Sequence, residues 1–257
     1  MLKAPIGVFD SGLGGLSVLN ALCQQLPHED YIYVADHAYT PYGKRSTAEI
    51  TERAHAISQW LIDKNCKLIV VACNTATTNA IDQLRASFSV PFIGIEPAIK
   101  PAALVSATGI IGVLATEGTL SSSLFHATTK DHAKDVRIIT QVGHGLVELV
   151  EQGLADSDTA DIQLKSALAS ILTNPIDHLV LGCTHYPFLS ASLKRILPDS
   201  VTIVDCNPAI AQQTSRILEK HAIQNNSGGT VLYNTTAKAN NKLWKSFGVE
   251  NITEVHI

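Results

Sequence analysis

The sequence predicts an α/β fold made of two pseudo-symmetric lobes, with mostly parallel sheets flanked by helices. Short apolar runs alternate with helix-length segments through most of the 257 residues, which is typical of repeated βα units. Several runs are apolar at successive positions, as strands covered on both faces must be. Two similar strings, VVACNTAT at 70–77 and LVLGCTHYP at 179–187, lie far apart and suggest one copy per lobe.

Ten segments are expected to form strands. Eight have strong apolar patterns: 6–10, 31–36, 68–73, 92–96, 110–116, 136–142, 178–183 and 201–206. Two more, 231–236 and 252–257, have weaker patterns. Helical patterns fill most of the intervals, with clear examples at 46–64 and 161–173.

A weak internal repeat in the sequence suggests where the two lobes divide. Asp10 precedes Cys73 by nearly the same interval as Thr116 precedes Cys183, and both Asp10 and Thr116 follow predicted strands. We therefore expect a first lobe of residues 1–97 plus 207–257, which carries Cys73. Residues 98–206 would form the second lobe, which carries Cys183.

The composition limits the possible functions. Hydrophobic residues make up 46% and charged residues 16%, as in globular proteins, and the formal net charge is −4. No block of Lys and Arg stands out, so nucleic-acid binding is not indicated. The N-terminus runs straight into a predicted strand and no apolar stretch is long enough to cross a bilayer, so we expect a cytoplasmic protein without membrane contact. The five cysteines are scattered without metal-ligand spacing, which favours a reducing compartment and predicts no metal site.

Cys73 and Cys183 each end a predicted strand, at the edge of a parallel sheet where ligands bind. Amide groups at the start of a following helix favour an anion and would raise the thiolate fraction. Hydrogen-bonding or titratable side chains follow the two cysteines: Asn74, Thr75, Thr184 and His185. A single buried cysteine is often only a small hydrophobe, but the pairing of two motifs favours chemistry. Two opposed thiols are what a two-base proton exchange at a carbon acid requires.

The turn FDSGLGG at 9–15 places Asp10 and Ser11 before a predicted helix. Three residues partly imitate a dinucleotide-binding fingerprint: Gly12, Gly14 and Asp36. The sixth position of that motif is Ser17 rather than glycine, and Asp10 would place negative charge beside a pyrophosphate. An acid here better suits a substrate ammonium group or a catalytic neighbour.

A second turn, TPYGKRS at 40–46, is shaped by Pro41 and Gly43. Together with Tyr42, these residues could present backbone amides to a ligand carboxylate. A plain surface turn is an equally good interpretation of this segment.

The strings FDSGLGGLSV, PYGKRS, VVACNTAT, PAIKPAA, LVLGCTHYP and VDCNPAIA occur in the order seen in glutamate racemases, which the chain resembles from residue 6 to about 218. The resemblance implies racemisation of L- and D-glutamate without a cofactor, and a supply of D-glutamate for peptidoglycan in bacteria. It also implies two pseudo-symmetric lobes with the active site in the cleft between them, commonly in a homodimer.

The resemblance also implies roles for individual residues. Cys73 would act on D-glutamate and Cys183 on L-glutamate, supported by Asp10, His185 and Glu151. The positions that match substrate contacts are Asp10, Ser11, Pro41, Tyr42, Gly43, Asn74, Thr75, Thr184 and His185. The segment VGHGLVELVEQG lacks the Cys-Pro of many members, so Glu148 is a neighbouring candidate for the role given to Glu151.

Three alternatives stay open at this point. A racemase for aspartate or hydantoins, or a decarboxylase that uses one cysteine, would share most of these motifs. A non-catalytic two-lobed binding protein would bind the ligand without exchanging its Cα proton. A nucleotide-dependent oxidoreductase would need the glycine-rich turn for a cofactor.

Overall fold

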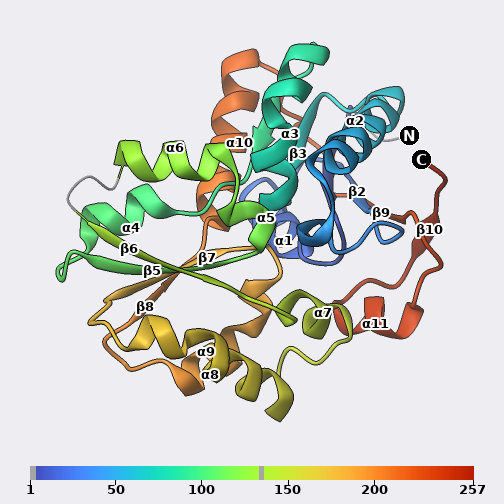
Figure 1. Cartoon of the computed structure of the whole chain (residues 1–257). Coiled ribbons are helices and arrows are strands. Elements are labelled where there is room, and N and C mark those ends of the chain that lie inside the picture. The colour runs from blue at the N-terminus through green and yellow to red at the C-terminus, as the bar shows by residue number, and fades with distance from the viewer. Residues whose placement is uncertain (1–3, 133–135) are drawn as a thin grey trace.

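The computed structural model describes residues 4–132 and 136–257, which form two parallel sheets with helices around them (Figure 1). Residues 1–3, the start of the predicted first lobe, lie outside the described residues. One sheet has six strands in the order β10-β9-β2-β1-β3-β4, and the other has four in the order β6-β5-β7-β8. Every strand pair within these sheets is parallel, as the sequence predicts.

Each of the ten predicted segments contains a strand. Their bounds are β1 Ile6–Asp10, β2 Tyr31–Ala35, β3 Leu68–Val71, β4 Phe92–Gly94, β5 Ile110–Ala115, β6 Arg137–Val142, β7 His178–Gly182, β8 Thr202–Val204, β9 Val231–Thr235 and β10 Ile252–Glu254. Several strands end one or two residues early, because the residues after them cap or begin a helix. Cys73, for example, is the N-cap of the helix that follows β3.

The two sheets repeat one arrangement. The order β2-β1-β3-β4 in the first sheet matches β6-β5-β7-β8 in the second, strand for strand in chain order. Strands β9 and β10 extend the first sheet beyond this shared unit. Cys73 after β3 and Cys183 after β7 therefore occupy equivalent positions, which confirms the pseudo-symmetry that their motifs predict.

Helices join most of the strands. Their bounds are α1 Leu16–Gln25, α2 Thr47–Asp63, α3 Asn74–Ser87, α4 Ile99–Val105, α5 Glu117–Leu120, α6 Ser123–His132, α7 Leu146–Glu151, α8 Asp158–Leu172, α9 Ser190–Ile196, α10 Asn207–His221 and α11 Asn241–Ser246, with 3₁₀ turns η1 Tyr42–Lys44 and η2 Tyr186–Leu189. Helix α2 matches its prediction because Ser46 and Glu49 form a capping box at its start. Helix α8 begins before the predicted residue 161, because the Ser157 side chain caps it by accepting from the Ala160 N–H.

The strands β1, β2 and β3 at the centre of the first sheet are buried at every residue, whereas the edge strands β6, β8 and β10 are partly exposed. Val8 of β1 belongs to one core cluster and Phe9 to another, since successive side chains of a strand point to opposite faces. The cluster around Val8 also includes Val113 of β5 and Val180 of β7, so residues of both sheets share one core. This shared core fixes the position of the carboxyl ends of one sheet relative to those of the other.

The chain crosses between the sheets twice. Helix α4 packs against β5 and β7 of the second sheet, whereas α10 packs against α1 and β4 of the first. The exact lobe boundaries, at 97 and 207, stay a prediction. No helix within the described part of the chain is both long and apolar enough to cross a membrane.

Candidate active site

The two cysteines predicted to act together line one cavity. Its volume is about 10 Å³, and its walls come from both sheets. The lining residues are Ser11, Pro41, Tyr42, Gly43, Cys73, Asn74, Thr75, Thr116, Val147, Cys183, Thr184 and His185. Of the sequence-predicted substrate contacts, only Asp10 is missing from this lining, and it lies directly behind it.

Cys73 is buried at the start of α3, with 5% of its surface exposed. Its Sγ accepts a hydrogen bond from the Ala76 N–H at 3.5 Å and lies 4.0 Å from Oγ of Ser11. Burial raises the pKa of Cys73 well above its ordinary value, and the neighbouring Asp10 raises it further. At neutral pH, Cys73 therefore carries its proton.

Asp10 ends β1 and is completely buried. Its Oδ2 accepts a hydrogen bond from the Gly15 N–H at 2.7 Å, whereas Oδ1 has no hydrogen-bond partner among residues 4–132 and 136–257. Burial raises the pKa of Asp10, although His185 and the Gly15 amide oppose the shift. A buried acceptor without a partner beside Cys73 is suited to a ligand ammonium group or to a proton.

As Cys73 has the titratable side chain of Asp10 beside it, Cys183 has that of His185. Its Sγ lies 3.7 Å from Nδ1 of His185, and Nε2 of His185 lies 2.6 Å from Oε1 of Glu151. Burial lowers the pKa of His185, but its hydrogen bonds with Cys183 and Glu151 outweigh burial and raise it overall. Nδ1 is therefore placed to accept a proton from the Cys183 sulfur.

The tautomer of His185 follows from its contacts. Nε2 is 2.6 Å from the Glu151 carboxylate and 3.2 Å from the Gly14 nitrogen. An Nε2–H cannot donate to Glu151 and also accept from Gly14. The shorter contact to a carboxylate is the stronger, so Nε2 carries the proton.

The structure separates the roles open to Glu148 and Glu151. Oε1 of Glu151 bonds His185 and accepts from the Leu13 N–H at 2.7 Å. Glu148 instead pairs with Lys44 at 2.5 Å, beside the residues Pro41 and Gly43 that also line the cavity. Glu151 therefore contacts the histidine behind Cys183, and Glu148 lies at the mouth of the cleft.

Tyr42 and Asp36 form a buried network beside the cavity. The Tyr42 hydroxyl donates to Oδ2 of Asp36 at 2.6 Å, and Arg53 donates to both carboxylate oxygens at 3.0 and 2.9 Å. Asp36 is fully buried, so it is not free to bind a ribose, and the dinucleotide interpretation loses its acidic residue. The network also holds the 41–43 turn against the site.

Three residues that line or adjoin the site were not predicted from the sequence. Thr116 and Val147 line the cavity, and Oγ1 of Thr116 lies 2.8 Å from Oγ1 of Thr75 across the cleft. His37 contacts Glu151, with Nε2 3.1 Å from Oε2. The symmetry between Asp10 and Thr116 is a signal that points to Thr116, but no sequence signal points to His37.

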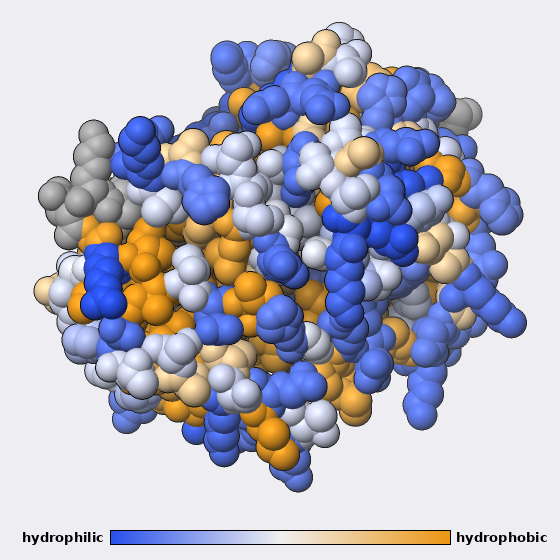
Figure 2. All heavy atoms as spheres, viewed as in Figure 1, coloured by the Kyte–Doolittle hydropathy of each residue, from blue (hydrophilic) through white to orange (hydrophobic). Residues whose placement is uncertain are grey.

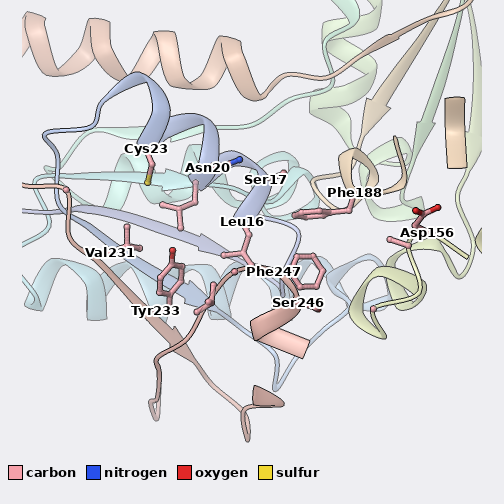
Figure 3. Close-up of a pocket in the computed structure, with 16 residues that line it drawn as sticks. Leu16, Ser17, Asn20, Cys23, Asp156, Phe188, Val231, Tyr233, Ser246 and Phe247 are labelled. Atoms are coloured by element: carbon pink, nitrogen blue, oxygen red, sulfur yellow. The ribbon is translucent and has the colours of Figure 1, made fainter. Parts of the chain in front are cut away.

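A much larger cavity lies elsewhere. It has a volume of about 770 Å³ and lies beside α1, where Leu16, Val231, Tyr233 and Phe247 point toward it (Figure 3). It contains a single cysteine, Cys23, and burial raises the pKa of that thiol to about 11. This cavity lacks the opposed acid–base pair, so it is not the candidate site. No cluster of His, Cys, Asp and Glu among the described residues could hold a metal ion.

Comparison with known proteins finds relatives over most of the chain. The sequence model of the Asp/Glu/Hydantoin racemase family matches residues 6–214. The glutamate racemase of Ectopseudomonas mendocina is 46% identical over 222 residues, which cover 86% of this chain and 84% of the relative. The glutamate racemase of Ralstonia pickettii is 44% identical and shares 86% of this chain and 79% of its own length.

Solved structures show the same relationship. Escherichia coli glutamate racemase, in complex with L-glutamate and the activator UDP-MurNAc-Ala, superimposes with a TM-score of 0.89 at 36% identity and 99% coverage of both chains. The Francisella tularensis glutamate racemase, in complex with D-glutamate, has a TM-score of 0.85 at 29% identity and covers 98% of this chain and 97% of its own. The aspartate racemase of Picrophilus torridus, at 15% identity and a TM-score of 0.61 over 86% of this chain and 94% of its own, shares the fold. The chain belongs to the Asp/Glu/hydantoin racemase family.

Proposed function

We propose that this protein interconverts L- and D-glutamate without a cofactor, with Cys73 and Cys183 as the two acid–base groups. The observation that carries the proposal is that both sulfurs line one small cavity at the carboxyl ends of equivalent strands. The relatives of 43–46% identity named as glutamate racemases support glutamate as the substrate.

For L-glutamate, the sulfur of Cys183 gives its proton to Nδ1 of His185 and then removes the proton from Cα. Cys73 enters this half-reaction as a thiol and donates its proton to the opposite face of Cα. One proton leaves the carbon and one arrives, so the product is D-glutamate and each sulfur has exchanged its role. The reverse reaction begins with Cys73 as thiolate and uses Asp10 as its neighbour.

The carbanion formed at Cα needs hydrogen-bond donors around the α-carboxylate. Side chains that could donate surround the cavity: Ser11, Asn74, Thr75 and Thr184. The buried Oδ1 of Asp10 is suited to accept from the substrate ammonium group. We also propose that Pro41, Tyr42 and Gly43, which line the same cavity, contact the substrate.

We further propose a cytoplasmic role in a bacterium, where the enzyme supplies D-glutamate for peptidoglycan. We assign residues 1–97 and 207–257 to the first lobe and 98–206 to the second. The support is that α10 packs on the first sheet and α4 on the second.

A homodimer is also part of the proposal. Leu104 and Val105 at the end of α4 are 75% and 64% exposed. Apolar side chains gather over α4 and the nearby strands β5 and β6, at the left of Figure 2. Sedimentation of the wild type should give the mass of two chains, and Leu104→Lys should give a lighter species. A wild-type sedimentation mass of one chain would contradict the dimer.

The activity is tested with purified protein and a panel of L- and D-glutamate, L- and D-aspartate and hydantoins, followed by polarimetry. We expect glutamate to be racemised from both enantiomers and far faster than the other compounds. A preference for aspartate or a hydantoin would support the sister enzymes, and binding without any change of optical rotation would support a binding protein.

A further inference from the structure

Glu151 lies between two histidines that come from distant parts of the chain. Its Oε1 is 2.6 Å from Nε2 of His185, and its Oε2 is 3.1 Å from Nε2 of His37. The carboxylate also accepts from the Leu13 N–H at 2.7 Å, so both of its oxygens are engaged. Only 12% of the Glu151 side chain is exposed, and a carboxylate held at three points has one orientation.

His37 is itself fixed from two further sides. Its Nδ1 lies 2.9 Å from Oγ1 of Thr235 at the end of β9. Its ring meets Trp244 of α11 edge to face, with the ring centroids 5.5 Å apart. Since the Thr235 hydroxyl can donate to Nδ1, Nε2 of His37 is free to carry the proton that Glu151 accepts. His37 therefore connects β9 of the first sheet to a side chain of α7.

A continuous chain of contacts leads from His37 to one catalytic sulfur. It runs from His37 through Glu151 to His185, and the Nδ1 of His185 lies 3.7 Å from Sγ of Cys183. Cys73 has a different environment, with Ser11, Asp10 and the Ala76 amide around its sulfur. A change at His37 is therefore transmitted to one of the two thiols.

We propose that His37 is a positioning residue for the Cys183 half of the reaction: it holds Glu151 so that Nε2–H of His185 points at Oε1 and Nδ1 points at the sulfur. This inference rests on the proposed racemisation of glutamate. Without His37, Oε2 of Glu151 loses its partner, the carboxylate can rotate, and His185 loses its fixed tautomer and orientation. The hydrogen bonds from His185 and His37 also lower the pKa of Glu151 against the effect of burial, so the carboxylate stays charged.

The expected defect has a specific kinetic form. L- and D-glutamate have equal free energies, so kcat/KM must be equal in both directions whatever the variant. A slower proton transfer at Cys183 is therefore invisible as a directional preference. It becomes visible in primary deuterium isotope effects, because these report which of the two proton transfers limits the rate.

The experiment compares isotope effects for L- and D-glutamate deuterated at Cα. In His37→Leu, which keeps apolar packing against Trp244, we expect kcat/KM to fall by roughly tenfold through loss of a hydrogen bond to a charged group. The isotope effect should rise for L-glutamate, whose Cα proton Cys183 removes. It should fall toward 1 for D-glutamate, because removal by Cys73 then becomes reversible before the slow step. His37→Gln, which can still donate to Glu151, should recover most of the wild-type pattern.

The matched control is His178→Leu. His178 is also a half-buried histidine paired with a carboxylate, Asp177, at 2.8 Å, but it lies at the amino end of β7, away from Cys183. Its isotope effects should equal those of the wild type. If His37→Leu does not fold, Thr235→Val removes the Nδ1 partner, together with the long hydrogen bond of 3.4 Å that the Thr235 hydroxyl accepts from the Ala237 N–H, and should shift the isotope effects in the same directions by less.

Several results would overturn the inference. Unchanged isotope effects, equal changes for both enantiomers, or the opposite pattern in the His37 or Thr235 variants would each contradict it. If the wild type does not racemise glutamate at all, the proposed function itself fails, and that result is seen before any variant is compared.

Discussion

At the scale of single residues, glycines 12 and 14 show what a sequence pattern cannot reveal. Their turn resembles a cofactor-binding loop. In the structure, however, the absence of a Cβ at these two glycines makes room for side chains of the active site. A Cβ at residue 12 would collide with the carboxylate of Glu151, and one at residue 14 with the ring of His185. The partners of Leu13 and Gly14 lie 138 and 171 residues away in the chain, so only the fold brings them together. Asp10, Cys73 and Cys183 could be predicted to lie close together because each lies at, or one or two residues beyond, the carboxyl end of a strand.

Both cysteines are needed in each direction of the proposed reaction, since one removes a proton and the other supplies one. Cys73→Ser and Cys183→Ser should each lower the rate of racemisation by roughly 10²–10⁴-fold from either enantiomer, because a hydroxyl is a far weaker acid than a thiol. Cys66→Ser, at a buried cysteine that does not line the cavity, is the control. Racemisation near the wild-type rate in Cys183→Ser would rule out the two-base scheme.

The pH dependence of kcat/KM is also set by single residues, the two thiols. The active form carries one proton on the pair of thiols, so kcat/KM should be bell-shaped in pH. Burial and Asp10 raise the pKa of Cys73, so its proton is lost only above the ordinary thiol range, where activity falls. In Asp10→Asn the negative neighbour is gone, the pKa of Cys73 falls, and the alkaline limb should move to lower pH. An alkaline limb that stays in place would contradict the assignment of that limb to Cys73.

At the scale of helices and strands, the apolar runs predicted the central strands most clearly, because burial on both faces leaves few polar positions, whereas the partly exposed β9 and β10 have weaker patterns. Helix starts were less predictable, since they depend on single capping side chains such as Ser157. The 41–43 turn was undecided in the sequence. Its position depends on Tyr42, which bonds to Asp36 beside Arg53 of α2, and this contact is invisible in the spacing of residues.

The ion pair of Arg53 with Asp36 should be important for stability. Both side chains are buried, so Arg53→Met leaves an uncompensated carboxylate in the interior and should lower the free energy of unfolding by about 3–5 kcal/mol. Arg195→Met is the control, because Arg195 is 46% exposed where it pairs with Asp161, and solvent screens this surface pair so that its loss should lower the free energy of unfolding far less. Urea unfolding measures both, and equal losses in the two variants would contradict the structural role of Arg53.

At the scale of the whole molecule, the repeated strand order explains why two similar cysteine motifs occur in one chain. The relation between the lobes could not be predicted, because it depends on contacts across the cleft such as Thr75 with Thr116 and Lys44 with Glu148. These contacts leave a cavity of about 10 Å³, which is room for about one water molecule. Glutamate therefore needs the cleft to open before it can enter.

Hydrogen exchange tests this opening. Saturating D-glutamate should slow amide exchange in residues 43–44 and 142–145, which line the mouth of the cleft, because the bound ligand favours the closed form. Exchange in α8, whose residues line neither the mouth nor the cavity, should stay the same. Equal exchange at the mouth with and without ligand would contradict the opening.

The central claim, that two sulfurs flank one carbon, is tested most directly by racemisation of L-glutamate in deuterated water. Circular dichroism follows the loss of optical activity, and mass spectrometry follows deuterium at Cα of each separated enantiomer. Early in the reaction, we expect deuterium in the D-glutamate formed and almost none in the remaining L-glutamate, because a separate group supplies the new proton. Equal deuterium in both enantiomers at that stage would mean that one base serves both faces, and would contradict the account.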